Sequence, residues 1–85
     1  QFIGVVRSYD PDTKMAVVEQ RNKMTVGEEI EVFGPYTDYF SQKLEVLLDE
    51  EGNPIESAPH PQQILHIKME RPVSENFMLR KRKEQ

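Results

Sequence analysis

Residues 24–35 read Met24-Thr25-Val26-Gly27-Glu28-Glu29-Ile30-Glu31-Val32-Phe33-Gly34-Pro35, and the pattern of this segment recurs along the chain. Gly27 favours a tight turn, because glycine adopts a positive φ without steric cost. The residues after the turn alternate between polar and apolar, which predicts a strand with one buried face and one solvated face. Pro35 ends that strand, because proline lacks the N–H that a strand ladder needs. This segment therefore predicts a turn, followed by a half-buried strand that ends at Gly34-Pro35.

The rest of the chain repeats this pattern of short strands and polar turns. Proline, glycine and aspartate mark turns at residues 10–13 and 49–54. Short strands with no helical periodicity predict an all-β fold, a small closed or partly open antiparallel β-barrel of about six strands. The inner face of the fourth strand is expected to carry Leu44, Val46 and Leu48. The expected strands are 2–9, 15–20, 29–33, 41–48, 63–70 and a short one around 77–79.

Length and composition narrow the possible classes of protein. The chain has 85 residues, which suits a single domain, and we expect a β-barrel over residues 1–79 followed by a basic tail over 80–85. It contains no cysteine, so disulfides, thiolate metal sites and cysteine nucleophiles are excluded within it. No signal peptide or apolar run of about 20 residues is present, so we expect a cytoplasmic domain without a membrane partner. Because the chain enters a strand pattern at once, we interpret it as a domain of a longer protein.

Side chains that could perform catalysis or bind a metal do not form a recognisable motif. His60 lies between two prolines and His66 alternates with a lysine on a strand, so neither suggests a zinc site. Glu29 and Glu31 share one strand face, where a solvated surface explains them better than acid–base catalysis does. No serine lies in a nucleophile motif. We therefore expect no catalytic residue, no metal and no cofactor in this domain.

An aromatic segment, Tyr36 to Phe40, is the least usual feature of the chain. Tyr36 and Tyr39 could stack on bases or hold a peptide, which makes them candidate binding residues. Alternatively, the aromatic rings could close one end of the barrel. In that arrangement Phe40 is the expected plug and Tyr36 the exposed ring.

Basic residues cluster in two places although the net charge is −4. A run of charge at a chain end is usually a solvated tail. If both clusters lie on one face of the barrel, however, they form a candidate phosphate-binding patch. These candidate residues are Arg21, Lys23, Arg80, Lys81, Arg82 and Lys83.

Five parts of the chain, taken in order, form a specific set: Ile3-Gly4-Val5-Val6 with Tyr9-Asp10-Pro11, Val18 to Lys23, Val26 to Pro35, Ala58-Pro59-His60-Pro61-Gln62 and Met78-Leu79-Arg80-Lys81. This set resembles the C-terminal domain of the collagenase-like U-thirty-two peptidase family. Separately, Val26-Gly27-Glu28-Glu29-Ile30-Glu31-Val32 resembles the turn and strand of the second, barrel domain of elongation factor Tu.

This resemblance implies a non-catalytic accessory domain beside a larger catalytic domain. The family includes collagen-degrading peptidases and relatives needed for hydroxylation of tRNA wobble uridine. For this domain, the resemblance implies recognition or placement of a protein or peptide substrate. RNA binding and structural docking or oligomerisation are the alternatives. The partners implied are the protein's own catalytic domain, a peptide substrate or RNA.

Overall fold

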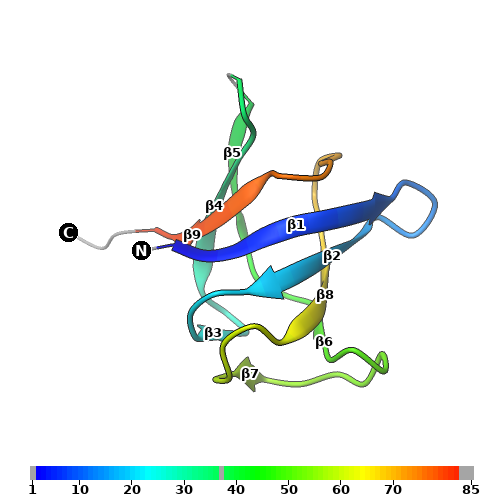
Figure 1. The fold of residues 1–85 in the computed structure, drawn as a ribbon, viewed down its shortest axis with the longest axis vertical. Helices are drawn as coiled ribbons and strands as arrows, with labels where there is room; N and C mark the ends of the chain where they lie inside the picture. Colours follow the sequence, from blue (N-terminus) through cyan, green and yellow to red (C-terminus); the bar gives the residue numbers. More distant parts are fainter. Residues whose placement is uncertain (1, 37, 83–85) are drawn as a thin grey trace.

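The computed structural model describes residues 2–36 and 38–82 and folds them into short strands joined by turns (Figure 1). Within that part of the chain, no helix is long and apolar enough to cross a membrane. The strands are β1 (Phe2–Asp10), β2 (Met15–Gln20), β3 (Met24–Thr25), β4 (Glu29–Phe33), β5 (Tyr39–Lys43), β6 (Leu47–Leu48), β7 (Ser57–Ala58), β8 (Ile64–Lys68) and β9 (Met78–Lys81).

Seven of these strands form one antiparallel sheet in the order β5-β4-β9-β1-β2-β8-β6. The sheet curls into a half-barrel, while β3 and β7 form a separate short ribbon at one end (Figure 1). The first residues of β1 lie beside the end of β9, where Phe2 pairs with Arg80. The all-β class and the partly open antiparallel barrel expected from the sequence are confirmed.

The turn at Gly27 and the strand that follows it form as expected from the sequence. Gly27 has a φ of 99°, and its N–H donates to the carbonyl of Leu44 at 2.8 Å. A carboxylate oxygen of Glu28 accepts the backbone N–H of Thr25 at 2.8 Å, which closes the turn. In the strand that follows, the alternate residues Ile30 and Val32 are fully buried.

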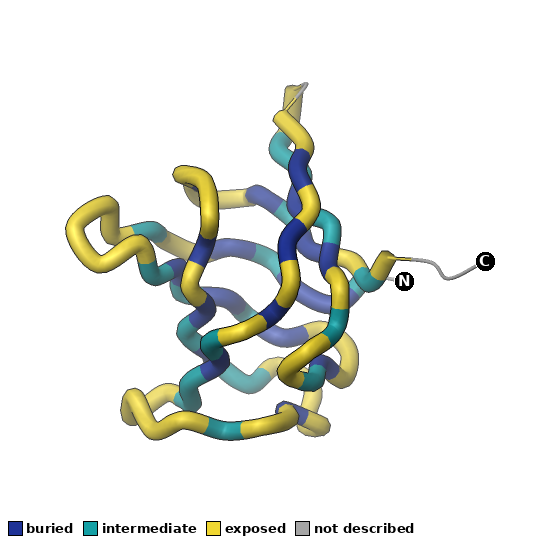
Figure 2. The backbone as a smooth tube through the Cα atoms, turned by 180° about the vertical axis from the view of Figure 1, so that it is seen from behind, coloured by how far each residue is buried: buried dark blue, intermediate teal, exposed yellow. Residues whose placement is uncertain are grey.

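The interior of the half-barrel is filled by alternate residues from each strand. Figure 2 shows this alternation of buried and exposed residues along β5. On β8 the expected inward residues Leu65 and Ile67 are fully buried, as is Met69 just after the strand. The fully or nearly fully buried side chains also include Ile3, Val6, Val18, Met24, Leu44, Leu47 and Leu79.

The expected single strand over residues 41–48 is wrong, because the chain forms two strands there. β5 pairs with β4, whereas β6 pairs with β8 at the opposite edge of the sheet. The ladder with β4 ends where the Leu44 N–H donates to Glu28, beside the Gly27 turn, and the chain then crosses the open side of the barrel. Leu44 faces inward as expected, but Leu47 is buried where we expected Leu48, which is half-buried like Val46.

The last strand is also longer than expected. The boundary between barrel and tail at residues 79 and 80 falls inside β9, because Arg80 and Lys81 pair with Glu31 and Ile30 of β4. The ladder continues to Arg82, whose N–H donates to the Glu29 carbonyl at 3.0 Å. Lys83 and the two residues after it lie outside the described part of the chain.

Candidate functional site

The basic residues at the end of the chain lie against the acidic residues of the β4 region. Antiparallel pairing of β4 with β9 sets the two charged runs side by side. Arg80 Nε lies 2.5 Å from a Glu31 carboxylate oxygen, and Lys81 Nζ lies 3.2 Å from Glu28. A third pair joins Arg82 and Glu29 at 3.9 Å. The two runs that stood apart in the sequence therefore neutralise each other in the fold.

Arg21 lies at the same end of the barrel as Arg80. The Arg21 N–H donates to the Ile3 carbonyl at 2.8 Å, while Arg80 pairs with Phe2 on the neighbouring strand. The fold thus brings two of the predicted basic residues to opposite sides of the start of β1. A guanidinium nitrogen of Arg21 is 4.0 Å from Glu19, so this charge is partly compensated as well. Lys23 is exposed and takes part in none of the ion pairs formed among the described residues.

Glu31 is the centre of a small polar network on the outer face of the sheet. The hydrogen bond from Arg80 lowers the pKa of the Glu31 carboxyl, and the hydroxyl of Tyr39, which donates to it at 2.9 Å, lowers that pKa further. The same bond to the carboxylate raises the pKa of Tyr39. The Arg80 guanidinium also lies over the ring of Phe33, 5.2 Å from its centroid. This network fixes Tyr39 on the sheet.

The aromatic segment is divided between the surface and the core. Tyr36 is 87% exposed near the end of the β4–β5 hairpin, and Tyr39 is 54% exposed at the start of β5. Phe40 is buried, as expected, with the guanidinium of Arg71 5.8 Å from its ring centroid. Figures 1 and 2 show the end of this hairpin standing away from the rest of the barrel. Two tyrosines are therefore presented on a projecting hairpin that Phe40 anchors in the core.

The two histidines lie apart in the fold. His60 is exposed in a turn, and His66 is half-buried on β8 opposite Val17. Among residues 2–36 and 38–82, no group of three or more His, Asp or Glu side chains is placed to hold a metal ion. Glu29 and Glu31, which we interpreted as a solvated surface, form ion pairs with the exposed side chains of Arg82 and Arg80.

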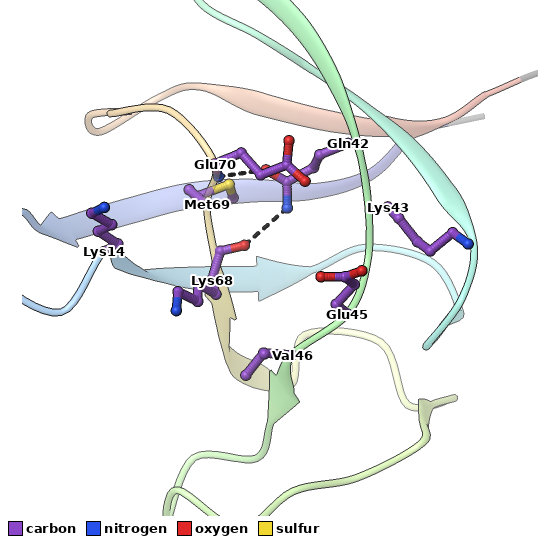
Figure 3. Close-up of a pocket in the computed structure, with 8 residues that line it drawn as sticks. All are labelled: Lys14, Gln42, Lys43, Glu45, Val46, Lys68, Met69 and Glu70. Carbon is purple, nitrogen blue, oxygen red and sulfur yellow. Dashed lines mark hydrogen bonds between the residues drawn. The ribbon is translucent and has the colours of Figure 1, made fainter.

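A buried glutamine, Gln42, spans the open side of the half-barrel, and we did not predict this from the sequence. Gln42 is only 3% exposed, and its amide nitrogen donates to the Lys68 carbonyl at 2.9 Å. Its amide oxygen accepts the Glu70 N–H at 2.8 Å. The side-chain amide thus pairs with the end of β8 and the chain just after it, as a strand backbone would (Figure 3). A polar residue at an inward position of β5, between buried Phe40 and Leu44, is the signal that could have revealed it.

A cavity of about 300 Å³ lies beside this glutamine, at the open side of the barrel. Figure 3 shows Lys14 and Lys68 on one side of it, with Lys43 and Glu45 on the other. None of these three lysines takes part in the ion pairs found in the described ranges. The cavity is lined by Lys14, Gln42, Lys43, Glu45, Val46, Lys68, Met69 and Glu70.

The described residues form a small all-β domain that presents tyrosines and lysines on its surface. The model of the Peptidase family U32 C-terminal domain matches residues 1–80. The chain belongs to this family.

Similar proteins agree with that assignment. The "tRNA hydroxylation protein P1" of Bacillus subtilis (strain 168) is 40% identical over 82 residues, which are 96% of this chain and 19% of that protein. Two crystal structures show the C-terminal domain of a Geobacillus thermoleovorans protein named as a U32 peptidase. One has a TM-score of 0.91 at 43% identity, covering 98% of this chain and 93% of that one. The other, a selenomethionine variant, has a TM-score of 0.89 at 44% identity, covering 94% and 98%.

Proposed function

We propose that this domain is a non-catalytic accessory module that recognises or places a protein substrate for a larger, collagenase-like peptidase of the U32 family. The observation that carries the proposal is the projecting β4–β5 hairpin with its exposed Tyr36 and Tyr39. Tyrosines supply a large contact area and a hydrogen-bonding hydroxyl, and they are enriched at binding surfaces for that reason. The chain spans about a fifth of the curated relative that it matches, so a catalytic domain elsewhere in the same protein is the proposed first partner.

The two tyrosines are suited to different parts of that task. Tyr39 is held by Glu31, so it loses little conformational freedom when a substrate binds. Tyr36 has no hydrogen bond from its hydroxyl among the described residues and is free to meet a ligand. The proposal includes a cytoplasmic location, as expected from the sequence.

The test is binding of the 85-residue protein to denatured collagen, with single tyrosine variants. We expect Tyr36→Ala to weaken binding about 5-fold or more, since buried tyrosines often contribute more than 1 kcal/mol at interfaces. His60→Ala, which removes an exposed ring from a different turn, is the matched control. Tyr39→Phe keeps the ring and loses only the bond to Glu31. Equal binding by Tyr36→Ala, Tyr39→Ala and the unaltered protein would contradict the proposal.

RNA binding is the second candidate function, favoured by the name of the B. subtilis relative and by the shared location of Arg21 and Arg80 at one end of the barrel. Phosphate contacts make the affinity for RNA fall as the salt concentration rises. For a single strand, each phosphate contact lowers the logarithm of the binding constant by about 0.7 when the salt concentration increases tenfold. Because Arg80 is paired with Glu31, we expect Lys23→Gln to reduce tRNA affinity more than Arg80→Gln does. A tRNA affinity that neither substitution changes would reject this candidate.

A further inference from the structure

The outer edge of β5 carries backbone groups that the sheet does not use. In the β4–β5 ladder, the Gly34 N–H donates to Asp38 at 2.9 Å and the Leu44 N–H donates to Glu28 at 2.8 Å. Bonded pairs in an antiparallel ladder recur at every second residue, so these two bonds fix which residues of β5 point toward β4. The residues whose N–H and C=O point away from β4 are Tyr39, Ser41 and Lys43.

This edge is open to solvent. β5 is the last strand of the sheet on its side, and all three residues are exposed. No backbone hydrogen bond reaches their outward groups from elsewhere in the described ranges. Natural sheets usually protect such an edge, which is a template for another strand, by covering it, by keeping it short, or with lysine, proline or a bulge. β5 has neither proline nor a bulge, so its protection is limited to its short length and to Lys43.

The charge beside the edge indicates what kind of strand would bind. Lys14, Lys43 and Lys68 line the cavity at the open side of the barrel, where they outnumber the two carboxylates, Glu45 and Glu70. These lysines form no ion pair with another described residue, in contrast to the basic residues of β9. An acidic side chain on a bound strand would meet lysines that no ion pair among the described residues engages.

We propose that the β5 edge and the neighbouring lysine-lined cavity bind an extended acidic peptide, which pairs with β5 as an additional strand. The alternating N–H and C=O groups of the edge match a peptide backbone, whereas phosphate oxygens could use only the N–H groups. Up to six backbone hydrogen bonds supply affinity, and the lysines select acidic side chains. This inference rests on the proposed role in substrate recognition and names the class of segment that is recognised.

The experiment measures fluorescence anisotropy of a labelled hexapeptide, Val-Glu-Val-Glu-Val-Glu, with the 85-residue protein. Two probes serve as controls: the same peptide with alternate backbone nitrogens methylated, and its Val-Lys counterpart. We expect saturable binding of the acidic peptide, with at least about tenfold weaker binding of both controls, because one loses backbone donors and the other reverses the charge. Equal binding of the methylated peptide would overturn the strand pairing, and equal binding of the Val-Lys peptide would overturn the acidic preference.

Variants locate the binding site. Ser41→Pro removes an N–H that the β4 ladder does not use, so we expect binding to fall about tenfold, while Ser41→Ala keeps that N–H and binds normally. Lys43→Gln and Lys68→Gln should each weaken binding about threefold, whereas Lys23→Gln, outside the cavity, should not. If Ser41→Pro does not fold, the lysine variants and the methylated peptide still decide the question.

The outcomes also separate this inference from the proposed function. Loss of collagen binding in Tyr36→Ala together with no binding of the hexapeptide would leave substrate recognition standing and overturn the β5 site. An oligonucleotide that binds in place of the hexapeptide, with the same loss in Lys43→Gln and Lys68→Gln, would assign the cavity to phosphate and also overturn the proposal.

Discussion

Replacing Gln42 tests how the half-barrel is held together. Gln42→Ala removes two hydrogen bonds, to the Lys68 carbonyl and from the Glu70 N–H, and leaves both backbone groups without their partner. Each bond contributes about 1 kcal/mol net, and an unpaired buried group costs about 1–3 kcal/mol. Because Lys68 and Glu70 are exposed, water can replace part of the loss. We therefore expect the free energy of unfolding to fall by about 1–3 kcal/mol.

The assay is urea unfolding of the 85-residue protein followed by circular dichroism. With a slope of about 1 kcal/mol/M for a small protein, the midpoint should fall by about 1–3 M at unchanged slope. Gln42→Met keeps the length of the side chain but not its hydrogen bonds, so it should lose nearly as much stability as Gln42→Ala. Ser41→Ala, an exposed neighbour, should stay within about 0.5 kcal/mol. A Gln42→Met protein as stable as the unaltered one would show that these two hydrogen bonds do not hold the half-barrel together.

Three further predictions concern the sheet and its core. Tyr39→Phe should raise the pKa of Glu31 toward its ordinary value, and an unchanged pKa in a carboxyl NMR titration would contradict the hydrogen bond between the two side chains. Because the folded-state pKa of Glu31 is lowered, its carboxylate stabilises the fold at pH values above the unfolded-state pKa, and this contribution is lost as the pH falls through the folded-state pKa. Gly34→Ala places a Cβ 2.8 Å from the ring of Phe77 and should cost about 1–3 kcal/mol in urea unfolding, whereas a neutral effect would show that the ring can move away. Leu65→Ala, fully buried on β8, should cost about 2–5 kcal/mol by the same measurement, and a loss below about 1 kcal/mol would place this side chain outside the core.

The sequence predicted the parts of the fold that depend on local alternation. The Gly27 turn, the β1–β2 hairpin and the inward faces of β4 and β8 follow from positive-φ glycine, turn residues and period-two patterns. The break between β5 and β6 could not be predicted in this way. Buried and exposed residues continue to alternate through Leu44, so the pattern alone does not show that β5 ends. The chain leaves β4 where their backbone pairing ends, and it then crosses to pair with β8 as β6.

The candidate site was predicted as a set of residue types but not as an arrangement. Tyr36 and Tyr39 are exposed as their segment suggested, yet the partner of Tyr39, Glu31, is set by strand register. The same holds for Arg80, whose charge is visible in the sequence. Its ion pair with Glu31 forms only because β4 and β9, which are far apart in the chain, are neighbours in the sheet. The inward position of Gln42 between Phe40 and Leu44 could have marked it as a buried polar residue, but its hydrogen-bond partners, Lys68 and Glu70, depend on the fold.

Substrate recognition by this domain can be tested by titrating the 85-residue protein, at low and moderate salt, against denatured collagen and against tRNA. We expect saturable binding to denatured collagen that Tyr36→Ala weakens at both salt concentrations. Saturable tRNA binding that weakens with salt, together with no binding to collagen, would contradict it and favour the RNA-binding role.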